Sequence, residues 1–509
     1  MIDTLTLKNF KGFSHLDHLK IKPITILCGT NSCGKSSILQ SLLLLKQTLE
    51  SQNPNQTLLL NGRFTHLGTF DNIVFQKNPE NRVTLDLKFA LSEQDTWKRG
   101  GRHSLPIRYV MQQLFPEVSK EYGQGGRYQI AIRFILASPK VKYIFSDVRQ
   151  TVVEEFHCTI EWLRRNGEIV PGGHFSFVLD PAGYYLGKWE NIRVGFLTPD
   201  GSNAPMSGEG KMKIQFGNLF PISFGDVDAS KEKSQPPPVF YLAYQMRDVA
   251  QAVFSSVTYL GPLREEPSRR YIYENEVLEI GIKGENAAYI YTSEQDNVLS
   301  DHFLYDSNEN TFKSVSSMKV SDAVTHWLDL MEIKGFKPEP LSEIIYLNLN
   351  SGASDKTRVN IADVGFGVSQ IFPIILEGIR MDKGNTLLLE QPEIHLHPNL
   401  QMQMADYFIS LALSKRKLII ETHSDHIVNR LVRRIVEDQN LSLADLIGIY
   451  FIRMTEHGAE YEEVNIDEKK GIANWPLDFF DQTATEQERI LQAGLEKRRK
   501  QRESQQGGK

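Results

Sequence analysis

Alternating and continuous runs of apolar residues predict the first elements of the chain. Residues 2–13 alternate apolar and polar side chains with period two and turn at Gly12, a pattern typical of an edge strand that enters a hairpin. The apolar run from Ile24 to Leu27 predicts a buried strand, and the apolar density from Ser37 to Leu49 predicts a core helix. A buried strand, a short loop and a core helix therefore follow one another near the N-terminus.

The pattern changes between about residues 84 and 240. Short β-patterned runs, such as Tyr128 to Leu136 and Thr159 to Trp162, are separated there by turns rich in glycine and charge. This region ends in a charged, proline-rich stretch from Lys231 to Pro238, which is typical of a linker. We therefore expect a β-rich or mixed domain to be inserted into the fold.

Beyond Val257 the pattern returns to α/β. Two apolar runs, Leu387 to Glu390 and Lys417 to Glu421, predict strands, and each is followed by a helical pattern. This order predicts a parallel α/β core that the insertion splits. The expected divisions are the two parts of the core at residues 1–83 and 241–436, the insertion at 84–240, and a C-terminal α/β extension with a basic tail at 437–509.

The loop between the first buried strand and the first core helix reads G-T-N-S-C-G-K-S. A glycine-rich loop in this position turns backbone N–H groups toward a phosphate, its lysine reaches the β- and γ-oxygens, and its serine hydroxyl ligates Mg²⁺. This P-loop predicts a nucleoside triphosphate, and a chance glycine-rich turn is the alternative. The residues expected to bind the nucleotide here are Gly29, Thr30, Asn31, Ser32, Cys33, Gly34, Lys35, Ser36 and Ser37, with Ser36 also on the metal.

Two later strands end in residues suited to phosphate chemistry. The first ends in the carboxylate of Glu390, the Walker B arrangement that holds Mg²⁺. The second places His423 just beyond its C-terminal end, where the ligand lies in a doubly wound sheet. A buried strand that merely ends in a charge and a structural histidine are the respective alternatives. We expect both side chains near the γ-phosphate.

A second glycine-flanked helix start lies at residues 363–370, D-V-G-F-G-V-S-Q. Such a helix N-terminus is an anion site, and the P-loop already supplies one. We therefore expect a dimer in which Gly367, Ser369 and Gln370 of one subunit cover the γ-phosphate held by the other. A simple helix cap is the alternative.

Composition and charge set further bounds. The 509 residues are 40% hydrophobic, which suits two to four folded domains. The net charge of −6 gives no overall basic signature, so DNA contact would need a local patch. The three cysteines argue for a reducing compartment rather than a disulfide framework. No apolar run approaches the roughly 18 residues of a membrane span, and we expect a cytoplasmic protein that does not contact the membrane.

The motifs together resemble the ABC-type ATPase heads of the RecF, SMC and OLD group. The resemblance rests on residues 7–13, the P-loop, and residues 365–370, 390–398 and 421–424. It implies an α/β P-loop NTPase with a mixed parallel sheet, interrupted by the β-rich insertion, that uses ATP and Mg²⁺. It also implies that Lys11 lies near the base or phosphates, that Ser369 contacts the γ-phosphate in trans, and that His423 is the switch histidine.

One position departs from that group. Its members usually end the Walker B strand in Asp-Glu, whereas this chain has Glu390-Gln391. A glutamine orients water but cannot accept its proton, and general-base help typically contributes about 10²–10⁴-fold. We therefore expect slow turnover, unless the turn brings Glu393 to the γ-phosphate as a substitute base.

Residues 259–264, 390–398 and 471–482 narrow the resemblance to the ATPase subunits of the Septu anti-phage system, which work beside an HNH nuclease. This implies a homodimer or higher homo-oligomer that acts as a nucleotide-gated sensor or scaffold and controls the partner nuclease. The alternative is a RecF-like DNA-repair ATPase that clamps DNA directly. The basic run from Lys497 to Arg502 suits DNA phosphates in that case, or is simply a solvated terminus.

Overall fold

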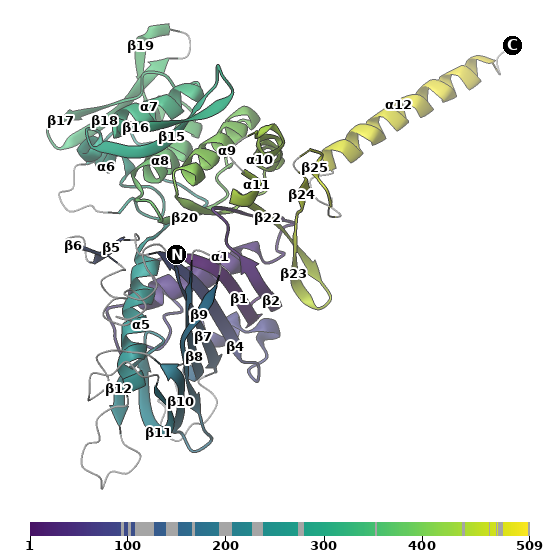
Figure 1. Ribbon diagram of the computed structural model, residues 1–509. Coiled ribbons are helices and arrows are strands. Elements are labelled where there is room, and N and C mark those ends of the chain that lie inside the picture. The colour runs from purple at the N-terminus through teal and green to yellow at the C-terminus, as the bar shows by residue number, and fades with distance from the viewer. Residues whose placement is uncertain are drawn as a thin grey trace.

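The computed structural model describes most of the chain (Figure 1). The described residues are 1–92, 96–99, 103–106, 127–138, 151–164, 168–192, 206–225, 238–272, 279–351, 354–439, 443–467, 469–474, 476 and 482–506. Of the expected linker, residues 231–237 lie outside them. The elements form two large sheets, a central sheet of six strands and an antiparallel sheet of nine. A further lobe of helices and short strands lies above the central sheet in Figure 1.

The central sheet has six strands and draws on both ends of the sequence. In spatial order they are β13 (Val257–Leu260), β20 (Thr386–Glu390), β21 (Lys417–Glu421), β3 (Ile24–Gly29), β22 (Ile447–Thr455) and β23 (Gly458–Glu463). The first five run parallel, and β23 returns antiparallel to β22. Strand β21 therefore lies between the P-loop strand β3 and the Walker B strand β20.

Both faces of the central sheet are buried, which explains the continuous apolar runs in its strands. The helices that cover it are α1 (Lys35–Leu49), α5 (Pro238–Ser255), α8 (Gly367–Arg380), α9 (Pro398–Leu413) and α10 (Asp425–Glu437). Successive side chains of a strand point to opposite faces. Leu388 and Ile419 pack in one core with α1 and α5, whereas Leu389 and Ile420 pack in the other with α8, α9 and α10. The sheet is thus the middle layer of an α/β sandwich.

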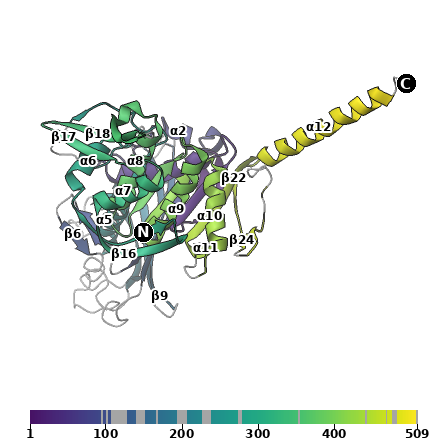
Figure 2. The ribbon, with the colours of Figure 1, turned by 90° about the horizontal axis from the view of Figure 1, so that it is seen from above.

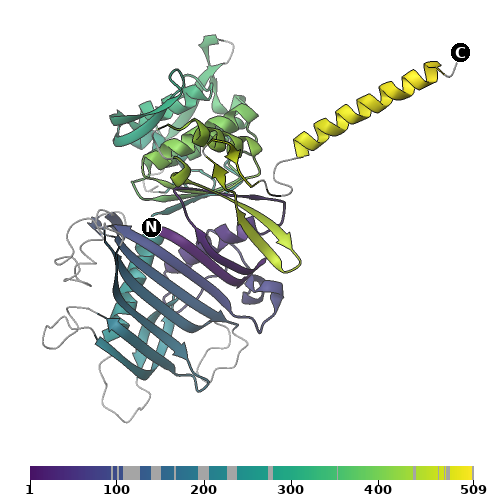
Figure 3. The ribbon, with the colours of Figure 1, turned by 45° about the vertical axis from the view of Figure 1, so that its right-hand side comes forward.

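The second sheet is antiparallel and has nine strands (Figure 3). In spatial order they are β12 (Phe220–Gly225), β11 (Met206–Gly217), β10 (Tyr185–Ile192), β9 (Ile169–Leu179), β8 (Val152–Leu163), β7 (Arg127–Ala137), β4 (Val83–Ser92), β1 (Ile2–Phe10) and β2 (Phe13–Lys20). Leu5 of β1 pairs with Leu87 of β4. The expected boundaries at 83/84 and 240/241 fall inside β4 and α5, so strands assigned to the insertion continue the sheet that β1 and β2 begin.

A lobe of smaller elements lies between β13 and α8 in the sequence. It contains β14 (Tyr271–Ile272), α6 (Ala287–Glu294), β15 (Val298–Asp306), β16 (Thr311–Lys319), α7 (Val320–Leu330), β17 (Lys337–Leu341), β18 (Ile344–Ser351), β19 (Ser354–Asn360) and η2 (Ile361–Asp363). The hydrophobic core of the lobe is continuous with that of the central sheet. Trp327 of α7 packs edge-on against Tyr407 of α9, with 5.0 Å between the ring centroids. The lobe therefore packs against the helical layer that covers the central sheet.

The remaining elements lie at the periphery. They are α2 (Phe70–Ile73), η1 (Phe75–Lys77), β5 (Thr96–Arg99), β6 (His103–Pro106), α11 (Leu443–Leu446), β24 (Ile466–Asp467), β25 (Gly471–Ile472) and α12 (Gln482–Gln506). Helix α12 projects away from the rest of the chain in all three views (Figure 2). The expected C-terminal extension includes β22 and β23, which belong to the central sheet. Among the described helices, none is long and apolar enough to cross a membrane.

Candidate nucleotide site

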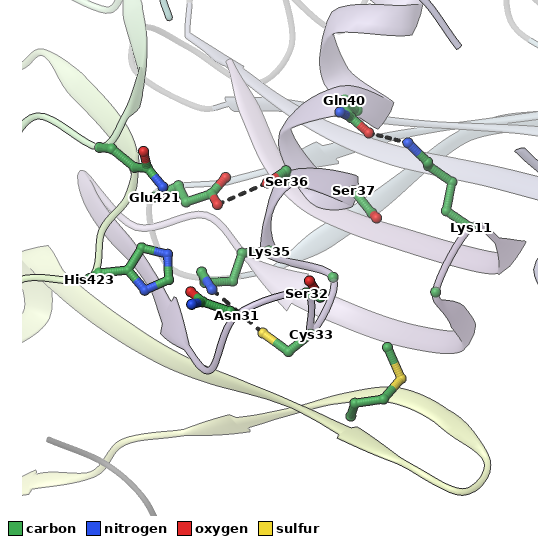
Figure 4. Close-up of a pocket in the computed structure, with 14 residues that line it drawn as sticks. Lys11, Asn31, Ser32, Cys33, Lys35, Ser36, Ser37, Gln40, Glu421 and His423 are labelled. Atoms are coloured by element: carbon green, nitrogen blue, oxygen red, sulfur yellow. Dashed lines mark hydrogen bonds between the residues drawn. The ribbon is translucent and has the colours of Figure 1, made fainter. Parts of the chain in front are cut away.

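A pocket of about 630 Å³ opens where the parallel strands of the central sheet end. This edge of an open parallel sheet is where ligands bind in α/β proteins, and the volume is typical of a small-molecule site. Figure 4 shows the side chains that line it. They are Lys11, Gly12, Asn31, Ser32, Cys33, Gly34, Lys35, Ser36, Ser37, Gln40, Gln391, Glu421, His423 and Met454.

The P-loop connects β3 to α1 and forms the floor of the pocket. Gly29 has φ of +143°, and a Cβ at this position would collide with the carbonyl oxygen of Ile452 in β22, so only glycine fits. The Nζ of Lys35 donates hydrogen bonds to the carbonyl oxygens of Gly29 at 3.2 Å and Thr30 at 2.6 Å. The loop therefore holds its lysine beside the N-terminus of α1, where backbone N–H groups attract a phosphate.

Ser36 lies beside a carboxylate that sequence reasoning did not single out. Its Oγ donates a hydrogen bond of 2.9 Å to Oε1 of Glu421, the last residue of β21. Glu421 is only 3% exposed, and its Oε2 has no hydrogen-bond partner among the described residues. Burial, together with the negative charge of Glu390, raises the pKa of Glu421 to about 7, against the opposing effects of Ser36 and Lys35.

These two residues fit a magnesium ion. Mg²⁺ prefers oxygen ligands and usually takes one or two carboxylates beside the substrate phosphates. A buried carboxylate with an oxygen left unpaired costs free energy that a cation would recover. Ser36 and Glu421 would therefore hold the metal, and its charge would favour the ionised form of Glu421.

Glu390, the residue expected to hold the metal, lies one strand further from the P-loop. Its Oε1 accepts a hydrogen bond of 3.0 Å from the hydroxyl of Tyr259 on the neighbouring strand β13. Burial raises the pKa of Glu390. It is outside the set of described residues that line the pocket. Because β21 intervenes between β20 and β3, Glu421 occupies the place next to Ser36.

Gln391 and Glu393 follow Glu390 but face different ways. Gln391 lines the pocket, and its backbone N–H donates to the carbonyl oxygen of Glu421 at 2.8 Å. The carboxylate of Glu393 accepts hydrogen bonds from the Thr422 hydroxyl at 2.8 Å and from the His423 backbone N–H at 2.6 Å. Glu393 therefore connects the turn after β20, which we call the Walker B turn, to the loop that carries His423. Both of its carboxylate oxygens accept hydrogen bonds from that loop.

A buried arginine fixes the same turn from the other side. Arg264, 4% exposed, donates hydrogen bonds of 2.9 Å each to the carbonyl oxygens of Glu390 and Gln391. Burial lowers its pKa to about 10, which still leaves it charged at neutral pH. Arg264 therefore positions the turn that follows β20.

His423 lies at the pocket that the P-loop forms. It is half-buried and lines the cavity on the same side as Glu421 (Figure 4). Burial, with a smaller contribution from the charge of Lys35, lowers the pKa of His423 below its usual 6.5. The lowered pKa favours the neutral imidazole, in which one ring nitrogen donates a hydrogen bond and the other accepts one.

The second glycine-flanked segment begins α8, as expected, but lies outside the set of described residues that line this pocket. The hydroxyl of Ser369 donates to the Phe366 carbonyl oxygen at 2.8 Å, and Gln370 is buried beside it. Gly365 has open space around it, and Phe366 is half-exposed against the ring of His395. Within one chain, the P-loop and this segment are therefore separate sites.

Three lining residues had weaker signals in the sequence. Glu421 ends a buried strand as Glu390 does, so the pattern that marked one carboxylate also marked the other. Gln40 lies on α1 just beyond the P-loop and accepts a hydrogen bond from Nζ of Lys11, whose pKa burial lowers. Met454 has no local signal, because only the pairing of β22 with β3 brings it to the pocket.

Two protein families match parts of the chain. The AAA ATPase domain family matches residues 1–151 and 275–428, which together are more than half of the chain. The chain belongs to the AAA ATPase domain family. The match confirms the predicted fold class, an α/β ATPase domain interrupted by an insertion, and the two matched parts are separated by residues 152–274. Residues 444–490 match a second family, described as a protein of unknown function (DUF3696).

Solved structures with a similar arrangement include heads of SMC proteins. The SMC head domain from Thermotoga maritima is 10% identical, with 91% of this chain and 99% of that chain covered and a TM-score of 0.36. The Smc head with an extended coiled coil bound to the C-terminal domain of ScpA, from Pyrococcus furiosus, is also 10% identical, with 91% and 96% covered and a TM-score of 0.37. No curated protein matches the chain. The assignment to a family therefore rests on the AAA ATPase domain.

Replacing Glu421 with glutamine is expected to weaken metal binding. The amide keeps the size of the side chain and an oxygen for Ser36 but removes the charge. Loss of a group that only orients a metal ligand already lowers metal affinity about 10–100-fold, and we expect at least that loss here. Mn²⁺ would serve as the probe, titrated by electron paramagnetic resonance in the presence of ATP. The matched control is Glu390→Gln, because the carboxylate of Glu390 is hydrogen-bonded to Tyr259. This variant should bind Mn²⁺ more tightly than Glu421→Gln. The reverse order would assign the metal to Glu390.

Proposed function

We propose that this protein is a slow ATPase that uses ATP and Mg²⁺ as an assembly switch between two copies of the chain. The observation that carries the proposal is the P-loop pocket, in which Lys35, Ser36, Glu421 and His423 converge. The segment at Gly365 to Gln370 is separate from that pocket and begins a 14-residue helix. A second copy could therefore supply this segment to the γ-phosphate. ATP then acts as a ligand with different affinities for two assembly states.

Slow turnover is supported by the residues around the γ-phosphate end. When bound, Mg²⁺ would bridge phosphate oxygens and neutralise the charge that develops on them. Gln391 lines the pocket at the position of the usual general base, and it can orient water without accepting a proton. Glu393 is bonded to Thr422 and to the backbone of His423. The site is therefore better suited to holding the nucleotide than to hydrolysing it rapidly.

We expect Lys35→Ala to lose nucleotide retention. A charged hydrogen bond contributes about 1.5–3 kcal/mol, which corresponds to about 10- to 150-fold in the dissociation constant of ATP. Isothermal titration calorimetry with ATP and Mg²⁺ measures this constant. Lys188→Ala, which changes an exposed lysine on β10, is the control and should bind as the original chain does. Unchanged affinity of Lys35→Ala would contradict the assignment of the pocket.

The in-trans arrangement predicts an ATP-dependent dimer that Gly365→Glu abolishes. A Cβ at Gly365 meets no atom within 4 Å, so the substitution should fold, but it adds a negative charge facing the γ-phosphate of the partner copy. Sedimentation analysis with a non-hydrolysable ATP analogue should show dimers for the original chain and monomers for the variant, with ATP binding to the monomer retained. Gly210→Glu on β11, where a Cβ also meets nothing, is the control. Dimers of Gly365→Glu would exclude this interface.

The biological setting that we propose is a bacterial anti-phage complex in which the dimer controls an HNH nuclease. The support is the likeness of residues 259–264, 390–398 and 471–482 to the Septu ATPase subunits. Purification of the tagged chain from its native operon with ATP present should yield a nuclease of that type. Recovery of salt-sensitive, ATP-stimulated DNA binding without any nuclease would instead favour the DNA-clamping alternative.

A further inference from the structure

The β22–β23 hairpin forms one wall of the nucleotide pocket. Strand β22 runs parallel to β3 as far as the pair Ile452–Gly29, so it enters the pocket at the first residue of the P-loop. Met454 then lines the cavity, two residues further along. The hairpin lies within residues 444–490, the segment that matches a family of unknown function. Residues 444–490 therefore contribute a side chain to the pocket.

The pocket has two chemically different ends. Glu421 and His423 lie together at one end, and Lys11 and Gln40 lie at the other (Figure 4). The hydroxyl of Ser36 and the carboxylate of Glu421 mark the first end as the place of the metal and the terminal phosphates. A nucleotide with its phosphates on the P-loop therefore extends its nucleoside toward Lys11 and the hairpin.

Met454 presents unpaired apolar surface at that second end. Met454 is 51% exposed, although it lines a cavity whose other members are mostly polar. Its Cε lies near Gly12, 3.7 Å from where a Cβ on that glycine would be. A methionine thioether makes favourable contacts with aromatic rings, and its flexible chain adapts to their shape. A purine ring placed here would bury this surface.

The hairpin is held against the turn between β1 and β2, independently of any ligand. The backbone N–H of Ala459 donates to the Gly12 carbonyl oxygen at 2.7 Å. Gly458 has φ of +115°, and a Cβ there would come within 2.9 Å of both that oxygen and the ring of Phe75. Only glycine allows so close an approach. The position of Met454 is therefore set by the fold before a nucleotide arrives.

We infer that Met454 is the base-contacting residue of the nucleotide site and that the β22–β23 hairpin exists in part to place it. The inference rests on the proposed nucleotide function and deepens it. The ligand is a purine nucleoside triphosphate, held at its base by apolar contact with the thioether. Such a contact does not read the hydrogen-bonding edge of the base, so the wall favours adenine and guanine nucleotides alike.

The test compares ligands with and without a base. Isothermal titration calorimetry with Mg²⁺ gives the dissociation constants of ATP, GTP and inorganic tripolyphosphate for the original chain and for Met454→Ala. The variant should bind ATP and GTP about two- to tenfold more weakly, the range expected for a sulfur–aromatic contact. Its affinity for tripolyphosphate should be unchanged. Met454→Leu, which keeps an apolar wall, should recover most of the loss, and His457→Ala at the exposed hairpin tip should behave as the original chain.

Two results would overturn the inference while leaving the proposed function intact. One is unchanged ATP affinity in Met454→Ala. The other is an equal loss for ATP and tripolyphosphate, because the substitution would then act through the P-loop rather than through the base. Failure of the original chain to bind either ATP or tripolyphosphate would overturn the proposed function as well.

Discussion

The hydrogen bond between Ser36 and Glu421 joins two halves of the chain that are 385 residues apart in sequence. It connects the start of α1 to the end of β21 across the edge of the central sheet. Besides burial, the negative charges of Glu390 and Glu393 both contribute to the raised pKa of Glu421. Lys35 is the cation on the pocket side of these carboxylates. Buried like charges are costly, so a cation bound beside Glu421 would stabilise this arrangement.

The other charged groups behind the pocket serve mainly to fix the ends of the strands. Arg264 donates hydrogen bonds to the carbonyl oxygens of Glu390 and Gln391. Glu393 accepts hydrogen bonds from the Thr422 hydroxyl and from the backbone N–H of His423. These bonds span three segments, so the turn after β20 and the loop after β21 form one unit. A residue that serves in this way is less available for proton transfer. The geometry therefore separates the groups that hold the site together from those that face the nucleotide.

The sequence predicted the elements of the central sheet better than their neighbours. Buried parallel strands are continuous apolar runs, which is why Ile24 to Leu27 and Leu387 to Glu390 were recognisable. The nine-stranded sheet was not predicted as one unit, because the pairing of Leu5 with Leu87 leaves no local trace in either segment. The choice between Glu390 and Glu421 as neighbour of Ser36 depends on strand order in space. Both residues end an apolar run. Glu421 is the neighbour of Ser36 because its strand, β21, lies between β20 and β3 in the sheet.

The turn that carries Lys11 is part of both the nine-stranded sheet and the pocket lining. It connects β1 to β2 at the edge of the nine-stranded sheet, and it lines the nucleotide pocket with Gly12. The backbone N–H of Lys11 also donates to the Ile73 carbonyl oxygen at 2.7 Å, and Gly12 accepts from the β22–β23 hairpin. A ligand that binds only the folded chain stabilises every segment that forms its site. Nucleotide binding at this pocket would therefore stabilise the edge of the antiparallel sheet together with the ATPase core.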